Sequence, residues 1–215
     1  MKLCIPCAML LGGVIGAVAV TQIAAGPDDK KTQPPADMQM DPQMKAMMDQ
    51  CIKDGMPGEP HKHMADMVGT WNAECKMYMD PTKEPTITTG KMVSKAMWDG
   101  RFIVGDFTGT FMGKPFSGQM TWGYNNVEKR YESTWRDSMG TATMFMTGTA
   151  SPDWKTYTST GDCAMNMPDG QKMAFKSREV IQVISPDKHT MTMYRSDPTG
   201  QGEMKEMEIT YTRAK

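Results

Sequence analysis

The stretch Trp71–Met77 reads WNAECKM, in which apolar and polar side chains alternate strictly. A period of two is typical of a β-strand with one buried face. The same alternation recurs to the end of the chain, in segments separated by turn-forming pairs such as Asp99-Gly100 and Asp169-Gly170. Asp-Gly between two alternating segments is a strong hairpin signal. The sequence therefore predicts consecutive antiparallel hairpins.

About ten strands are expected between Val68 and Arg213, at the spacing usual for all-β domains. An open sheet of that size would leave two unpaired edges, whereas closure into a barrel removes them. The predicted fold class is all-β: a single antiparallel up-and-down β-barrel of about ten strands, with a short N-terminal helix and a disordered linker before it.

The composition supports this fold and excludes one class of function. Methionine occurs 26 times and the β-former threonine 23 times, while leucine is absent beyond residue 11. A segment of more than 200 residues without leucine is unlike a helical bundle. The net charge of −1 argues against nucleic-acid binding, which needs a basic surface.

Three domains are expected along the chain. Residues 1–25 hold an uncharged, largely apolar stretch after Lys2, which fits a signal peptide or an uncleaved N-terminal membrane anchor. Residues 26–60 form a Pro/Met-rich linker, and residues 61–215 form the barrel. We therefore expect an exported protein, periplasmic or secreted, which contacts a membrane only through residues 1–25 if they are not cleaved.

Two short helices are expected before the barrel. Within the linker, Met44, Met47, Met48 and Cys51 recur at helical spacing, which predicts an amphipathic helix from Pro42 to Lys53. The second is predicted from Pro60 to Met67, because proline is favourable in the first turn of a helix.

The segment Gly69-Thr70-Trp71 opens the first strand, and Arg213 ends the last one on the same face as Tyr211. This resembles the lipocalin, or calycin, arrangement, in which an arginine lies over a Gly-x-Trp indole at the barrel floor. The resemblance implies a cation–π contact between Arg213 and Trp71.

A wider set of runs resembles the bacterial domain of unknown function 1579 family, which is lipocalin-like. The resemblance implies a barrel fold and an exported bacterial origin, and it carries over no catalytic residue. The runs that support it are residues 67–71, 77–81, 100–102, 111–118, 123–125, 133–141 and 207–213.

The abundant methionines have two interpretations. Thioethers bind Cu(I), and His61 and His63 stand beside Met64, downstream of Met residues that include Met38 and Met40. Methionine is also an adaptable core filler that can replace leucine. Because methionine occurs in most of the apolar series, the second interpretation is favoured, and copper handling ranks third among the functions considered.

The cysteines and the remaining motifs indicate no reaction. Cys75 and Cys163 share the inward parity, so each is either a small buried side chain or half of a disulfide. No serine-nucleophile elbow, phosphate loop or zinc motif is present. The run Arg136-Asp137-Ser138 is best explained as a loop motif. We therefore expect that the protein is not an enzyme and that it needs no cofactor or metal.

A small apolar or amphipathic ligand inside the barrel is the favoured function. The alternative is a ligand-free structural or envelope-stress protein whose barrel is filled by side chains. Glu179 is either a polar anchor in the cavity or a point where its strand leaves the core, and Ser133 or Tyr131 could also orient a head group. The predicted cavity residues are Met92, Phe102, Val104, Phe116, Met120, Trp122, Tyr131, Trp135, Met144, Met146 and Glu179.

Overall fold

The computed structural model describes residues 41–80, 82–197 and 202–215. The chain divides into two compact units, Met1–Gly55 and Met56–Lys215. The predicted signal or anchor segment, residues 1–25, lies outside the described residues, as do residues 26–40 of the predicted linker. In the described part of the chain, no helix is long and apolar enough to cross a membrane.

The first unit contains the helix α2 (Pro42–Asp54), close to the predicted bounds. Its start follows from two residues: Pro42 stands in the first turn, and the Asp41 side chain accepts a hydrogen bond from the Gln43 backbone amide at 3.2 Å. An ion pair of 2.8 Å between Lys45 and Asp49 joins successive turns. None of its residues is buried.

The second unit begins with α3 (Glu59–Met64) and the short 3₁₀ helix η1 (Ala65–Met67), where a single helix was predicted. Ten strands follow. They are β1 (Gly69–Met77), β2 (Thr86–Met97), β3 (Phe102–Phe111), β4 (Lys114–Asn125), β5 (Arg130–Asp137), β6 (Met144–Ala150), β7 (Thr156–Asn166), β8 (Lys172–Ser185), β9 (Lys188–Ser196) and β10 (Glu203–Arg213).

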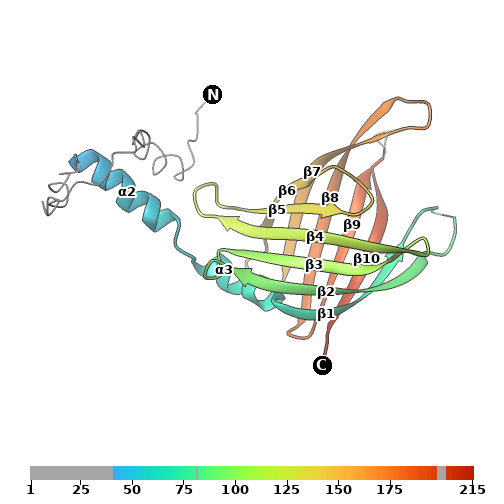
Figure 1. The fold of residues 1–215 in the computed structure, drawn as a ribbon, viewed down its shortest axis with the longest axis horizontal. Helices are drawn as coiled ribbons and strands as arrows, with labels where there is room; N and C mark the ends of the chain where they lie inside the picture. Colours follow the sequence, from blue (N-terminus) through green and yellow to red (C-terminus); the bar gives the residue numbers. More distant parts are fainter. Residues whose placement is uncertain (1–40, 81, 198–201) are drawn as a thin grey trace, which may run out of the picture. The chain divides into compact units, whose positions relative to one another are not determined.

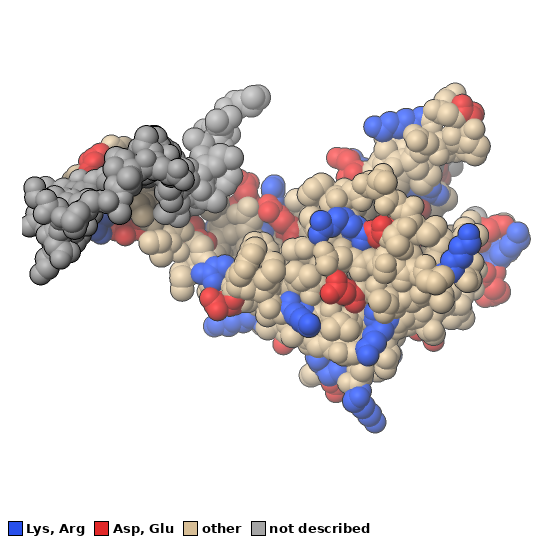
Figure 2. Space-filling model, in the orientation of Figure 1, with Lys and Arg blue, Asp and Glu red and all other residues tan. Residues whose placement is uncertain are grey.

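Each strand pairs antiparallel with the next, and β1 pairs with β10, so the sheet closes into a barrel (Figure 1). Trp71 of β1 stands opposite Arg213 of β10 where the two ends of the sheet meet. The predicted fold class is confirmed. On the face shown in Figure 2, acidic and basic side chains are interspersed over the barrel.

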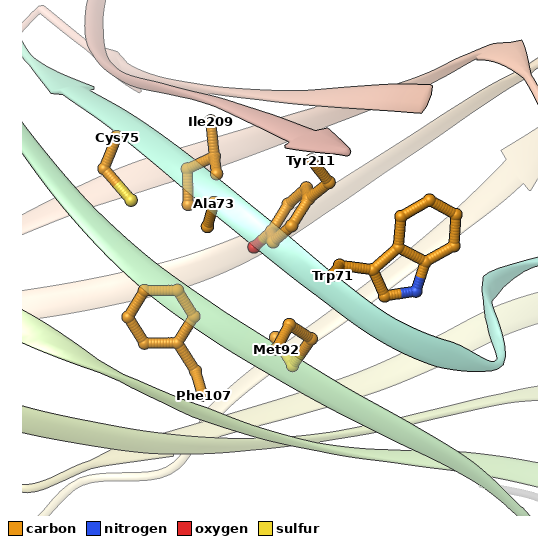
Figure 3. Packing of buried hydrophobic residues seen from close by; sticks show 7 residues of the cluster. All are labelled: Trp71, Ala73, Cys75, Met92, Phe107, Ile209 and Tyr211. Carbon is orange, nitrogen blue, oxygen red and sulfur yellow. The ribbon is translucent and has the colours of Figure 1, made fainter. Parts of the chain in front are cut away.

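The register places one parity of each strand inside the barrel. Trp71 faces Met92 on β2, and Met92 faces Phe107 on β3. Their side chains project toward those of β10, such as Tyr211, and form one buried cluster (Figure 3). The opposite parity, such as Asn72 and Glu74 on β1, is exposed.

A second cluster fills the end of the barrel next to α3 and η1, which we call the floor. Trp122 stacks on Tyr131 with ring centroids 5.3 Å apart, and Tyr157 packs edge-on against Trp122 at 5.1 Å. Met64 and Ile103 are fully buried in the same cluster. The opposite end, which carries the β3–β4 and β5–β6 turns, is the mouth. The space between floor and mouth is available for a cavity.

Candidate functional site: a cavity inside the barrel

A cavity of about 450 Å³ occupies the barrel lumen. It extends from Met67 and Trp71 at the floor to Thr110 and Met139 near the mouth. Pockets for small molecules commonly measure about 300–1,000 Å³. The barrel is therefore not completely filled by its own side chains.

Most of the cavity wall is apolar. Aromatic side chains from β1, β3, β4, β5 and β10 contribute to it, together with a larger set of methionines. Thioether side chains repack around ligands of different shape, so this wall is adaptable. The methionines that line it are Met67, Met77, Met92, Met120, Met139, Met144, Met146, Met191, Met193 and Met207.

Eight of the eleven residues predicted from strand parity line this cavity. They come from β2, β4, β5, β6 and β8, and they are Met92, Phe116, Met120, Trp122, Trp135, Met144, Met146 and Glu179.

Phe102 and Val104 do not line it, and their predicted orientation is corrected. On β3 the inward positions are Ile103 and Phe107, which are buried and face Ala96 and Met92 of β2. Phe102 instead packs edge-on against Trp98 in the β2–β3 turn, at 5.8 Å between ring centroids. The start of β3 is apolar on both faces, so hydrophobicity alone gave the wrong parity.

Tyr131 points inward but lies in the floor cluster, outside the cavity lining. Its ring packs between Trp122 and Tyr124, and burial raises the pKa of its hydroxyl group. Among the described residues, this hydroxyl has no hydrogen-bond partner. Tyr131 thus packs in the floor beneath the cavity and does not line it.

The predicted lining omits several residues of the wall, including all those on β9 and β10. His189, Met191 and Met193 alternate along β9, and Ile209 and Tyr211 alternate along β10. The period-two signal was present in both strands. The same parity argument that was used for the other strands would have placed these residues in the lining.

Glu179 of β8 faces the cavity from the middle of the wall, between Ser159 of β7 and Met193 of β9. Its exposed part faces the lumen and protein surrounds the carboxyl group, so burial raises the pKa to about 7. No hydrogen bond or ion pair engages this carboxyl within residues 41–80, 82–197 and 202–215. The sequence left open whether Glu179 faces the cavity or marks a point where its strand leaves the core, and the structure places it in the cavity wall.

Tyr211 of β10 and Cys75 of β1 are titratable residues that also line the cavity. Burial raises the pKa of the Tyr211 hydroxyl, and the nearby Cys75 and Glu179 raise it further. Burial also raises the pKa of the Cys75 thiol. Both groups are therefore neutral at ordinary pH. Cys75 and Cys163 are free thiols, so the disulfide alternative is not observed.

His189 separates the cavity from a second recess beneath the floor, of about 330 Å³. Its ring stacks on Tyr211 at 4.7 Å and meets Trp71 edge-on at 4.4 Å. Burial lowers the pKa of His189 to about 4, and the positive charge of Arg213 lowers it as well. The imidazole is neutral, and its buried Nδ1 has no partner among the described residues.

Arg213 lies over the indole of Trp71, with its guanidinium carbon 4.1 Å from the ring centroid, as the lipocalin resemblance implies. The Trp71 indole N–H donates to the Met67 carbonyl at 3.0 Å. Gly69 is required beside them, because its φ is +135° and an added Cβ would lie 2.5 Å from Arg213 Nη1. The Gly-x-Trp signature thus has a steric cause.

The two histidines of the copper hypothesis make separate contacts. His61 Nδ1 accepts the Gly58 backbone amide at 3.0 Å, whereas the His63 ring stacks on Trp154 at 4.6 Å. Met38 and Met40 lie outside the described residues. Throughout the described ranges, no group of three or more His, Cys, Asp or Glu side chains is placed to hold a metal ion.

These features define a closed ten-stranded β-barrel with a mostly apolar lumen. Residues 56–213 match the family described as "Protein of unknown function (DUF1579)", and the chain belongs to that family. The resemblance inferred from the sequence is confirmed. No curated protein matches the chain.

Solved structures that are similar to it include the following two. Rv2717c from M. tuberculosis is 16% identical, with a TM-score of 0.51 over 74% of this chain and 100% of that one. A redesigned β-barrel is 15% identical, with a TM-score of 0.37 over 70% of this chain and 94% of that one. At this identity the first likeness shows the fold alone.

Proposed function

We propose that this protein binds a small apolar or amphipathic molecule in the lumen of its barrel. The observation that carries the proposal is the cavity of about 450 Å³ with an apolar, methionine-rich wall. A barrel of purely structural role has its lumen filled by side chains. An apolar cavity without a ligand forfeits packing contacts and costs stability.

The test uses the tryptophans that line the cavity, Trp71, Trp122 and Trp135. Their fluorescence should change on titration with the neutral apolar dye N-phenyl-1-naphthylamine, and the dye emission should increase. Ser133→Phe places a benzyl group in the lumen and should weaken dye binding about tenfold or more, which corresponds to about 1.4 kcal/mol.

Thr147→Phe is the matched control, because Thr147 is exposed on β6 beside the inward Met146. It should leave dye binding unchanged. Equal loss in both variants, or no dye binding by the wild-type chain, would contradict the proposal.

We further propose that the protein acts outside the cytoplasm. The support is in the sequence: an uncharged apolar stretch from residue 3 to residue 25 precedes a proline-rich segment. Fractionation of the native host should recover the protein from the periplasm, the medium or the membrane. Recovery from the cytosol alone would contradict this assignment.

A further inference from the structure

The cavity holds acidic groups and no fixed cation. None of its described lining residues is Lys or Arg, while Asp137 and Glu179 are carboxylic acids. Arg195 of β9 lies outside the lining and pairs with Glu206 at 3.0 Å, and Arg213 also lies outside it, over Trp71. His189 is neutral because its pKa lies at about 4. The lumen therefore offers nothing to neutralise an anionic ligand.

The two carboxyl groups of the lining differ in their partners. Asp137, near the mouth, accepts hydrogen bonds from the Trp135 indole at 2.8 Å and from the Met139 backbone amide at 2.9 Å. Glu179 has no such partner within the described ranges and stands between Ser159 and Met193, midway along a mostly apolar wall. Burying an ionised carboxyl without a partner is costly, and a bound cation or donor removes that cost.

We propose that Glu179 selects an amphipathic amine, a molecule whose apolar body fills the methionine-rich lumen and whose ammonium group pairs with this carboxylate. The inference rests on the proposed ligand-binding function and assigns the charge of the ligand. A fatty acid of the same length would place its carboxylate beside the Glu179 carboxylate in a cavity of low dielectric, so it is disfavoured.

The other titratable groups that face Glu179 do not change charge near neutral pH. Tyr211 on β10 and Cys75 on β1 keep their protons because burial raises the pKa of each, and His189 on β9 is neutral above pH 5.5 because its pKa is about 4. The Arg195–Glu206 pair lies outside the lining. Glu179 has a pKa raised to about 7. Its carboxyl is thus the group whose charge changes in the middle of the cavity wall between pH 5.5 and 8.

The experiment displaces N-phenyl-1-naphthylamine from the full chain with dodecylamine, dodecanol or laurate, each below its aggregation limit. At pH 8 dodecylamine should displace the dye at about 10- to 100-fold lower concentration than the other two, the range expected for a buried charged hydrogen bond. Lowering the pH to 5.5 should reduce this advantage, because Glu179 gains a proton while the amine stays charged.

Glu179→Gln keeps the shape of the side chain and removes its charge. With displacement measured relative to the dye affinity of each variant, it should lose the preference for dodecylamine over dodecanol and laurate and show no pH dependence of that preference. Glu74→Gln is the matched control, since Glu74 is exposed on the outer face of β1, and it should retain the preference.

Equal displacement by laurate or dodecanol, or an amine preference that survives in Glu179→Gln, would overturn this inference and leave ligand binding intact. Failure of the dye itself to bind the wild-type chain would instead overturn the proposed function, and this inference with it.

Discussion

Arg213, near the C-terminus, stacks on Trp71 near the start of β1, with 4.1 Å between the guanidinium carbon and the ring centroid. The same guanidinium donates to the Val68 carbonyl at 2.9 Å and to the Pro186 carbonyl at 2.9 Å. One side chain thus joins the first strand, the last strand and the β8–β9 turn. This junction closes the floor beneath the cavity.

Arg213→Lys should lower the free energy of unfolding by about 1–3 kcal/mol, because lysine keeps the charge but loses the planar set of donors. Urea denaturation at pH 7 measures the change. Arg136→Lys is the control: Arg136 is exposed on β5 and donates to Gln119 at 3.0 Å, and its replacement should cost under about 0.5 kcal/mol. Equal losses would show that the Arg213 junction contributes nothing special.

Trp71→Ala should cost about 3–5 kcal/mol, the usual range for removing a buried aromatic side chain. Trp71 is 2% exposed, whereas Trp98, in the β2–β3 turn, is 66% exposed and provides the comparison. Trp98→Ala should cost under about 1 kcal/mol. Chemical denaturation of both variants measures the difference, and a Trp71→Ala loss below about 1 kcal/mol is incompatible with this floor.

Gly69→Ala should destabilise the fold through two effects, backbone strain at φ +135° and a clash with Arg213. Strain in this region costs about 1–3 kcal/mol, and displacement of the guanidinium adds to it. Gly113→Ala separates the two effects, because Gly113 has φ +74° but no atom within 4 Å of an added Cβ. Its thermal midpoint should fall less than that of Gly69→Ala. The reverse order would remove the steric explanation of the Gly-x-Trp motif.

The sequence predicted the fold well because each strand carries its own period-two pattern. In β1, for example, Asn72 and Glu74 alternate with Trp71 and Ala73, and their burial alternates in the same way. Local alternation together with turn signals is sufficient for an antiparallel meander, since each strand pairs with its neighbour in sequence.

The cavity was less predictable, and β3 shows why. Phe102, Ile103 and Val104 are consecutive apolar residues, so hydrophobicity assigns no face there. Asp106 shares the parity of Phe102 and Val104 and is exposed. Its charge would have indicated that this face of β3 points to solvent. The position of the floor cluster was also not predictable, because it depends on α3 and η1 packing under the barrel and on which aromatic rings fill the end.

His189 should make stability fall on mild acidification. Its pKa in the folded protein is about 4, below the ordinary 6.5, so the unfolded chain binds more protons between these values. The free energy of unfolding therefore decreases as the pH drops from 6.5 to 4, by at most about 1.4 kcal/mol per pH unit. His189→Phe should abolish this contribution, and urea titrations at pH 7.5 and pH 5 measure it. An unchanged difference between the two pH values would mean that the imidazole is not desolvated.

Glu179 should act in the opposite direction. Burial raises its folded pKa from 4.5 to about 7, so the folded protein binds more protons than the unfolded chain between these values. The contribution of Glu179 to stability is then lost as the pH rises through 7. Glu179→Gln should match the wild type near pH 4.5 and exceed its free energy of unfolding by about 1–3 kcal/mol at pH 8.

Denaturation of wild type, Glu179→Gln and Glu74→Gln across pH 4.5–8 separates this effect from the titration of surface carboxyls. A difference between wild type and Glu179→Gln that stays constant with pH would mean that the Glu179 carboxyl is equally solvated in both states. If the stability difference between the two proteins grows above pH 5, the ionised Glu179 carboxyl destabilises the ligand-free protein. A cation bound beside this carboxyl removes that destabilisation. Saturating dodecylamine at pH 8 should then raise the thermal midpoint of the wild type more than that of Glu179→Gln, because only the wild type has a buried charge to neutralise.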